Sequence, residues 1–238
     1  MAGSNISAPK SAETKFSWDY DVPDTPFWSD LDFTVGRNFL TCFSPSEIQG
    51  MHLDASLDKP QKLHLLLKLV QERLASREVE VVPESLLSFD FGEWQRLMLA
   101  IQTMQNCLGL PEEEETVRII MKNGRDGKRN ISGVNMMARF KEKHGLYSEA
   151  EALAREALPV LRGHEMLGVD SPQVLGTTRT LIRCVWKQGL EKEARKLVNE
   201  TSDLIERMGH GKFRKYQAEE QIMIRDLVVE LENWTASK

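Results

Sequence analysis

Apolar residues recur three and four positions apart along most of the chain, which is the spacing of one face of a helix. In the first half this spacing predicts helices over residues 59–77 and 93–108. A proline directly after Ser44 and a run of acids from Glu112 mark two further helix starts. From residue 134 onward five helices are expected, at 134–144, 147–166, 172–188, 191–208 and 212–234.

Strand patterns are almost missing from the sequence. Polar and apolar residues alternate for only a few positions, over 78–82, and we interpret that stretch as a connector. The pattern therefore predicts an all-α protein. Prolines and aromatic residues crowd the start of the chain, which denies it a long helix. The expected segments are a partly extended N-terminal extension, N-terminal helices with a degenerate repeat, two helical hairpins and a C-terminal capping helix, at 1–43, 44–133, 134–208 and 209–238.

The second half of the chain contains an internal repeat. When residues 135–162 are shifted by 44 positions onto 179–206, identical residues recur in the same order. The identical pairs are Arg139/Arg183, Lys143/Lys187, Gly145/Gly189, Leu146/Leu190, Glu149/Glu193, Ala150/Ala194, Leu153/Leu197 and Glu156/Glu200. This order predicts a hairpin used twice, in which glycine ends the first helix and alanine lets the second approach closely.

The repeated stretches, which begin at Gly145 (GLYSEAEALAREAL) and at Gly189 (GLEKEARKL), resemble tetratricopeptide repeats. The long period and the link over residues 167–172 are similar to the kinesin light-chain type of that repeat. Lys141 departs from the family, which prefers an aromatic residue there. The resemblance implies a short α-solenoid, in which stacked hairpins bury apolar faces that one hairpin leaves exposed.

The resemblance also implies a concave groove lined by the first helix of each hairpin, here 134–144 and 172–188. The residues expected to bind a peptide there are Asn135, Arg139, Lys143, Arg179, Arg183, Trp186 and Lys187, with Glu142 beside them. Arg179, Arg183 and Lys187 are four residues apart, so an acidic ligand would offset their repulsion. The alternative is that these charges are solvated or paired with Glu142, Glu191 or Glu193.

Two tryptophans near the N-terminus stand among acids: Trp18 beside Asp19, and Trp28 close to Asp30. They are similar to the tryptophan-acidic peptides that kinesin light-chain repeats recognise. One hypothesis is that this tail, from the same or a neighbouring chain, is a ligand of the basic groove. The alternative is that its aromatic residues cover the N-terminal helices as part of their core.

Composition narrows the class of partner. The net charge is −5, which argues against a nucleic-acid or anionic-membrane surface as the main partner. Three cysteines give no disulfide framework, and no secretory signal or membrane span is recognised, so we expect a cytoplasmic protein. The five histidines lack metal-ligand spacing, and no metal or cofactor is expected. The expected partner is an acidic protein or peptide, and exposed ends of a short repeat array also favour a homodimer.

A helical enzyme or small-molecule binder is the alternative function, with the N-terminal half folded over the groove to enclose a pocket. The neighbours His164 and Glu165 diverge around a helix and make a poor acid–base pair. The glycine-rich basic loop at 122–133 lacks the spacing of a phosphate-binding loop. An interaction module is therefore the favoured interpretation, and an enclosed aromatic pocket would favour the alternative.

Overall fold

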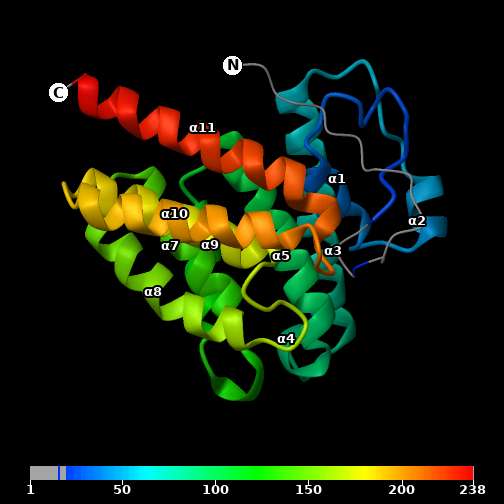
Figure 1. Ribbon diagram of the computed structural model, residues 1–238. Coiled ribbons are helices and arrows are strands. Elements are labelled where there is room, and N and C mark those ends of the chain that lie inside the picture. The colour runs from blue at the N-terminus through cyan, green and yellow to red at the C-terminus, as the bar shows by residue number, and fades with distance from the viewer. Residues whose placement is uncertain (1–15, 17–19, 238) are drawn as a thin grey trace. The chain divides into compact units, whose positions relative to one another are not determined.

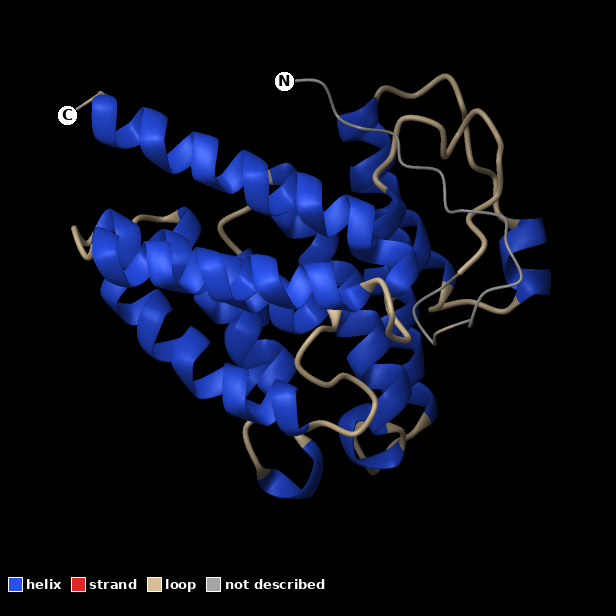
Figure 2. Ribbon diagram, viewed as in Figure 1, coloured by secondary structure: helices blue, strands red, loops and turns tan. Residues whose placement is uncertain are grey.

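A computed structural model describes Phe16 and residues 20–237 of the chain (Figure 1). The described residues form α-helices, two short 3₁₀ helices and no strand, so the predicted all-α class is confirmed (Figure 2). None of these helices has the length and apolar character needed to cross a membrane. The α-helices are α1 (Phe33–Leu40), α2 (Pro45–Gly50), α3 (Lys59–Glu80), α4 (Leu86–Phe89), α5 (Phe91–Leu108), α6 (Glu113–Lys122), α7 (Ile131–Lys143), α8 (Tyr147–Gly163), α9 (Pro172–Lys187), α10 (Glu191–Met208) and α11 (Gln217–Ala236).

The chain divides into two compact units, and the boundary lies inside α6, between Thr116 and Val117. The predicted segment boundaries at residues 43, 133 and 208 do not coincide with this division. The N-terminal extension belongs to the same unit as the helices that follow it, and α11 belongs to the same unit as α7–α10.

In the first unit α5 packs against α1, α3 and α4. The N-terminal extension, expected to be partly extended, includes helix α1, whose residues Val35, Phe39 and Leu40 form an apolar face that is buried. Trp28 is also buried, and its ring centroid lies 5.8 Å from that of Phe39. The residues before α1 therefore contribute to the core of this unit.

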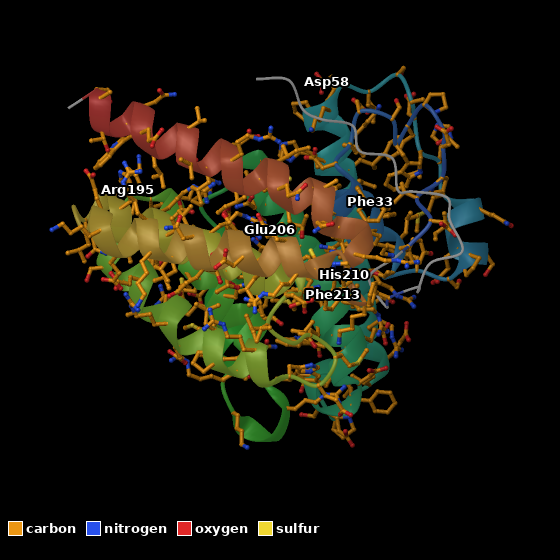
Figure 3. All side chains as sticks on the ribbon, viewed as in Figure 1. Phe33, Asp58, Arg195, Glu206, His210 and Phe213 are labelled. Atoms are coloured by element: carbon orange, nitrogen blue, oxygen red, sulfur yellow. The ribbon has the colours of Figure 1, made fainter. Side chains whose placement is uncertain are left out.

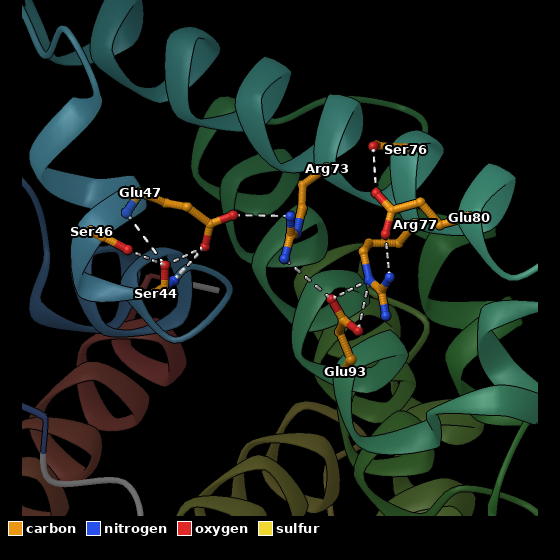
Figure 4. Close-up of polar contacts among 8 residues, drawn as sticks. All are labelled: Ser44, Ser46, Glu47, Arg73, Ser76, Arg77, Glu80 and Glu93. Atoms are coloured by element: carbon orange, nitrogen blue, oxygen red, sulfur yellow. Dashed lines mark hydrogen bonds and ion pairs between the residues drawn. The ribbon is translucent and has the colours of Figure 1, made fainter.

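An ion-pair network joins three helices of the first unit (Figure 4). Glu93 of α5 accepts hydrogen bonds from Nε of Arg77 at 2.9 and 3.0 Å, and an Nη of Arg73 lies 3.7 Å from it. Arg73 also pairs with Glu47 of α2 at 3.0 Å. Glu47 completes a capping box with Ser44, the predicted helix start. The network thus ties α2 and α5 to one face of α3, because Arg73 and Arg77 are four residues apart on that helix.

The second unit is built from helices that pack in chain order. Helix α7 packs against α8, α8 against α9, α9 against α10 and α10 against α11. Further contacts join α7 to α9 and α9 to α11. Figure 1 shows α10 and α11 running antiparallel, since α11 returns toward the end at which α10 begins. Helices α7, α9 and α11 therefore form one layer, and α8 and α10 form the other.

The turns between α7 and α8 and between α9 and α10 have the same geometry. Gly145 and Gly189 adopt φ values of 75° and 85°, which glycine reaches without strain. The next amide donates to the carbonyl five residues back in each turn, from Leu146 at 2.9 Å and from Leu190 at 3.1 Å. The repeated Gly-Leu pair in the sequence thus specifies the same turn twice.

Candidate functional site

A groove of about 590 Å³ lies within the second unit, along helices α7, α9 and α11. It is therefore formed by one layer of the unit. Its walls are mainly polar and charged, with a few apolar side chains at α11. The lining residues are Asn135, Arg139 and Glu142 of α7, Pro172, Gln173, Gly176, Thr177, Arg179, Thr180 and Arg183 of α9, and Met223, Asp226, Leu227 and Glu230 of α11.

Local sequence signals fix where the two predicted groove helices begin. Asn130 caps α7 by accepting from the amides of Ser132 at 3.0 Å and Gly133 at 3.3 Å. Ser171 caps α9, and Pro172 occupies its first turn. Between the helices, the hydroxyl of Thr177 donates to Oδ1 of Asn135 at 2.9 Å. That bond sets α7 and α9 side by side at the centre of the groove.

Four of the seven predicted peptide-binding residues line this groove: Asn135, Arg139, Arg179 and Arg183. Two of these arginines already have partners on α11. Arg179 pairs with Glu220, and the two side chains are only 13% and 4% exposed. Arg183 donates from Nε to Glu230 at 3.1 Å. The acids that pair with α9 therefore come from α11, whereas Glu142, Glu191 or Glu193 were expected.

The expectation of a basic groove needs correction as well. Arg139, Arg179 and Arg183 face the carboxylates of Glu142, Asp226 and Glu230 across the lining, so the formal charges cancel. The prediction of a basic groove rested only on the helices at 134–144 and 172–188. Helix α11, expected to be a cap, is a third wall and supplies two of the three carboxylates.

Lys143, Trp186 and Lys187 are not among the residues that line the groove. Trp186 is 1% exposed, its Nε1 donates to Thr235 at 2.9 Å, and Arg195 stacks on its ring. Nζ of Lys187 lies 4.2 Å from the ring centroid of Trp234. Each step of four residues turns a helix about 40° beyond a full turn. The row that begins at Arg179 therefore rotates away from the groove before it reaches Lys187.

Several groove side chains have no hydrogen-bond or ion-pair partner within the part of the chain that the structure describes. Arg139 is exposed and unpaired, as are the carboxylates of Glu142, which is half-buried, and Asp226, which is exposed. Oε1 of Gln173 is buried and accepts no hydrogen bond from the described residues. The groove thus presents a cation and two anions that remain available to a ligand.

Glu142 has the most perturbed acid–base behaviour in the groove. Burial raises the pKa of its carboxyl, and the nearby carboxylate of Glu230 adds to the rise. The cations of Arg183, Arg139 and Lys187 oppose it without cancelling it. A buried carboxylate is destabilised when it loses water without gaining a partner. A ligand cation beside Glu142 would remove that cost.

The structure describes only part of the proposed self-ligand. Trp18 and Asp19 lie outside the described residues. Trp28 packs in the core of the first unit, and Asp30 pairs with Nζ of Lys62 at 2.7 Å. That lysine is itself buried, and its Nζ lies 5.4 Å from the ring centroid of Phe27. The placement of Trp28 and Asp30 is the one expected from the alternative interpretation, in which the tail covers the N-terminal helices.

The polar residues at the start of α9 and all the groove residues of α11 were not predicted from the sequence. Residues 173, 176, 177, 180 and 183 follow the spacing of one helix face, so extending this face back from Arg183 would have found them. The α11 residues carried no comparable signal, because nothing local shows which face of a terminal helix meets α9.

The cysteine thiols, the possible metal ligands and the glycine-rich loop are the other candidates for chemistry. Burial raises the pKa of the Cys42 and Cys184 thiols to about 12, so neither is a thiolate near neutral pH. Within the described residues, no group of three or more His, Cys, Asp or Glu side chains is placed to hold a metal. In the glycine-rich loop, Arg129 pairs with Glu156 of α8 at 2.7 Å, which anchors the end of the loop.

Comparison with known proteins assigns no relationship to this chain. No protein-family model matches it, no curated protein matches it, and no solved structure matches it. The function of this chain must therefore be inferred from the groove and its side chains.

Proposed function

We propose that the chain is a protein–protein interaction module that binds a peptide in the groove between α7, α9 and α11. The observation that carries this proposal is the set of groove side chains without partners among the described residues, with Arg139 at its centre. A groove with many polar groups and a few apolar ones suits a peptide, whose main chain and side chains offer both kinds of contact. Arg139 is suited to a carboxylate because a guanidinium can donate two parallel hydrogen bonds.

The proposal includes the tetratricopeptide-like character of the second unit. Support comes from the order of helix packing and from the matching turns at Gly145 and Gly189. In this interpretation α7–α8 and α9–α10 are two hairpins, and α11 stands where the first helix of a third hairpin would stand. The groove then corresponds to the concave face of a short solenoid. The cytoplasmic location expected from cysteine usage belongs to the same proposal.

The alternative of an enzyme or small-molecule binder called for a pocket lined by tryptophan and phenylalanine. The lining of the groove is instead rich in amide, hydroxyl and charged groups. This composition favours a ligand with many hydrogen-bonding groups over a compact apolar one. We therefore retain peptide binding as the proposed function.

The test selects peptides from a phage-displayed random dodecapeptide library on the full-length protein and measures their affinity by fluorescence anisotropy. The variant that blocks the groove is Gly176→Leu. A Cβ at this position meets only Nη2 of Arg179, at 3.7 Å, and leucine favours the helix more than glycine does. Gly176→Ala is the matched control, because it improves the helix while filling little of the groove.

We expect the selected peptides to lose at least tenfold in affinity with Gly176→Leu and with Arg139→Ala. Affinity should be unchanged with Gly176→Ala and with Arg162→Ala, which removes an exposed arginine of α8. A peptide of residues 14–24, which contains Trp18 and Asp19, tests the self-ligand hypothesis under the same conditions. Peptides that bind Gly176→Leu as well as the wild type would contradict the proposed function.

A further inference from the structure

The unpartnered groups of the groove differ in charge, so they would bind ligand groups of opposite charge. Arg139 would be satisfied by an acid. Glu142 needs the opposite, because a carboxylate accepts hydrogen bonds and is satisfied by a donor or a cation. A purely acidic peptide would place further negative charge near Glu142 and leave its carboxylate without a partner.

The order of these groups follows from the alignment of α7 with α9. The bond between Thr177 and Asn135 fixes one level of the groove. Gln173 lies one turn before Thr177, and Arg139 and Glu142 lie one and two turns after Asn135. From Gln173 to Arg183 is ten residues of helix, or about 15 Å, which is the length of roughly five residues of extended peptide. One short peptide can therefore span the levels of Arg139 and Glu142.

The cations around Glu142 are occupied by other groups. Arg183 donates to Glu230, and the ammonium of Lys187 lies over the ring of Trp234. Arg139 lies one turn away on α7 and approaches Glu142 without forming an ion pair. On the α11 side the facing charges are the carboxylates of Asp226 and Glu230. A positive group of the ligand beside Glu142 would also lie near the carboxylate of Glu230.

Building on the proposed peptide-binding function, we propose that the groove selects peptides with charges of both signs, a carboxylate for Arg139 and a lysine or arginine for Glu142. Arg139 and Glu142 are three residues apart on one helix, which places their Cβ atoms about 5–6 Å apart. Alternate residues of an extended peptide are separated by about 6.6 Å and point to the same side. The preferred ligand therefore carries its acid and its base two positions apart.

The test uses the peptides that depend on the groove in the library selection. In each peptide the basic residue nearest the acid is replaced by glutamine, and the affinities of both forms are measured with the wild type and with Glu142→Gln. Glu206→Gln is the matched control, because Glu206 is an exposed carboxylate of α10 outside the groove (Figure 3). The same comparison tests the other charge. The acid of each peptide is replaced by asparagine, and the affinities of both forms are measured with the wild type and with Arg139→Gln.

We expect the loss of the basic residue to weaken binding about tenfold with the wild type and with Glu206→Gln, and to have little effect with Glu142→Gln. Peptides that contain only acids and bind Glu142→Gln as tightly as the wild type would overturn this inference and leave the proposed function intact. A selection that yields no peptide sensitive to Gly176→Leu would overturn both.

Discussion

Glu142 combines the two properties expected of a binding residue that costs stability in the unbound protein. Its carboxylate is half-buried without a hydrogen bond or an ion pair to the described residues, and burial raises its pKa. At Glu142 the folded state therefore binds more proton than the unfolded chain over a pH window that begins near 4.5, the ordinary pKa of the group. The free energy of unfolding contributed by Glu142 falls as the pH rises through that window.

Glu142→Gln should consequently stabilise the protein at pH 7, by roughly 0.5–1 kcal/mol after allowance for solvent screening, because it removes a charge that burial disfavours and nearby cations only partly offset. Below pH 4.5 the advantage should disappear, since the wild-type carboxyl is then protonated in both states. Urea denaturation at pH 7 and pH 4 measures the difference. A variant less stable than the wild type at pH 7 would show that Glu142 is already neutralised in the unbound protein.

Gly133 and Gly176 both lie inside helices, and the space around each predicts that replacement by alanine will have opposite effects on stability. A Cβ at Gly133 would lie 2.5 Å from the backbone of Met121, which cannot move aside as a flexible side chain can. Gly133→Ala should lower the free energy of unfolding by about 2 kcal/mol or more. Gly176→Ala should raise it by roughly 0.5–1 kcal/mol, because alanine is the better helix former. Thermal denaturation of the two variants compares them, and equal shifts would contradict the close approach of α6 and α7.

At the scale of elements, spacing predicted the long helices well. The helix bounds near Lys59, Leu108 and Glu191 follow directly from apolar periodicity, a glycine stop and a repeated turn. Helix α1 was missed because its eight residues follow a proline-rich stretch and carry too short a pattern to stand out. The partners of Arg179 and Arg183 were missed because Glu220 and Glu230 lie more than forty residues away, and only packing of α11 brings them together.

The pair between Arg179 and Glu220 anchors the first turn of α11 to α9. Burial raises the pKa of Glu220, and the guanidinium of Arg179 offsets part of that rise. Glu220→Ala leaves a largely buried arginine without its acid and should cost about 3 kcal/mol. Glu219→Ala, one residue earlier and without such a partner, should change stability by less than about 0.5 kcal/mol. Chemical denaturation of both variants decides whether this pair holds α11 in place.

On the scale of the whole molecule, α7–α11 pack within one unit and form the complete groove. Because the unit boundary falls inside α6, a fragment should begin before Glu113 to keep that helix whole. Residues 110–238 should therefore fold alone, with a helical spectrum and one cooperative unfolding transition. The fragment should also bind the selected peptides with the affinity of the full chain. A disordered fragment would show that the second unit depends on the first.

A peptide that lies along α7, α9 and α11 should perturb the amides of these helices. Amide chemical-shift mapping of the full-length protein with a saturating selected peptide measures this effect. We expect the largest changes at residues 135–142, 173–183 and 223–230, and small ones on the outer faces of α8 and α10. Changes confined to α8 and α10, or to the first unit, would be incompatible with peptide binding in the groove.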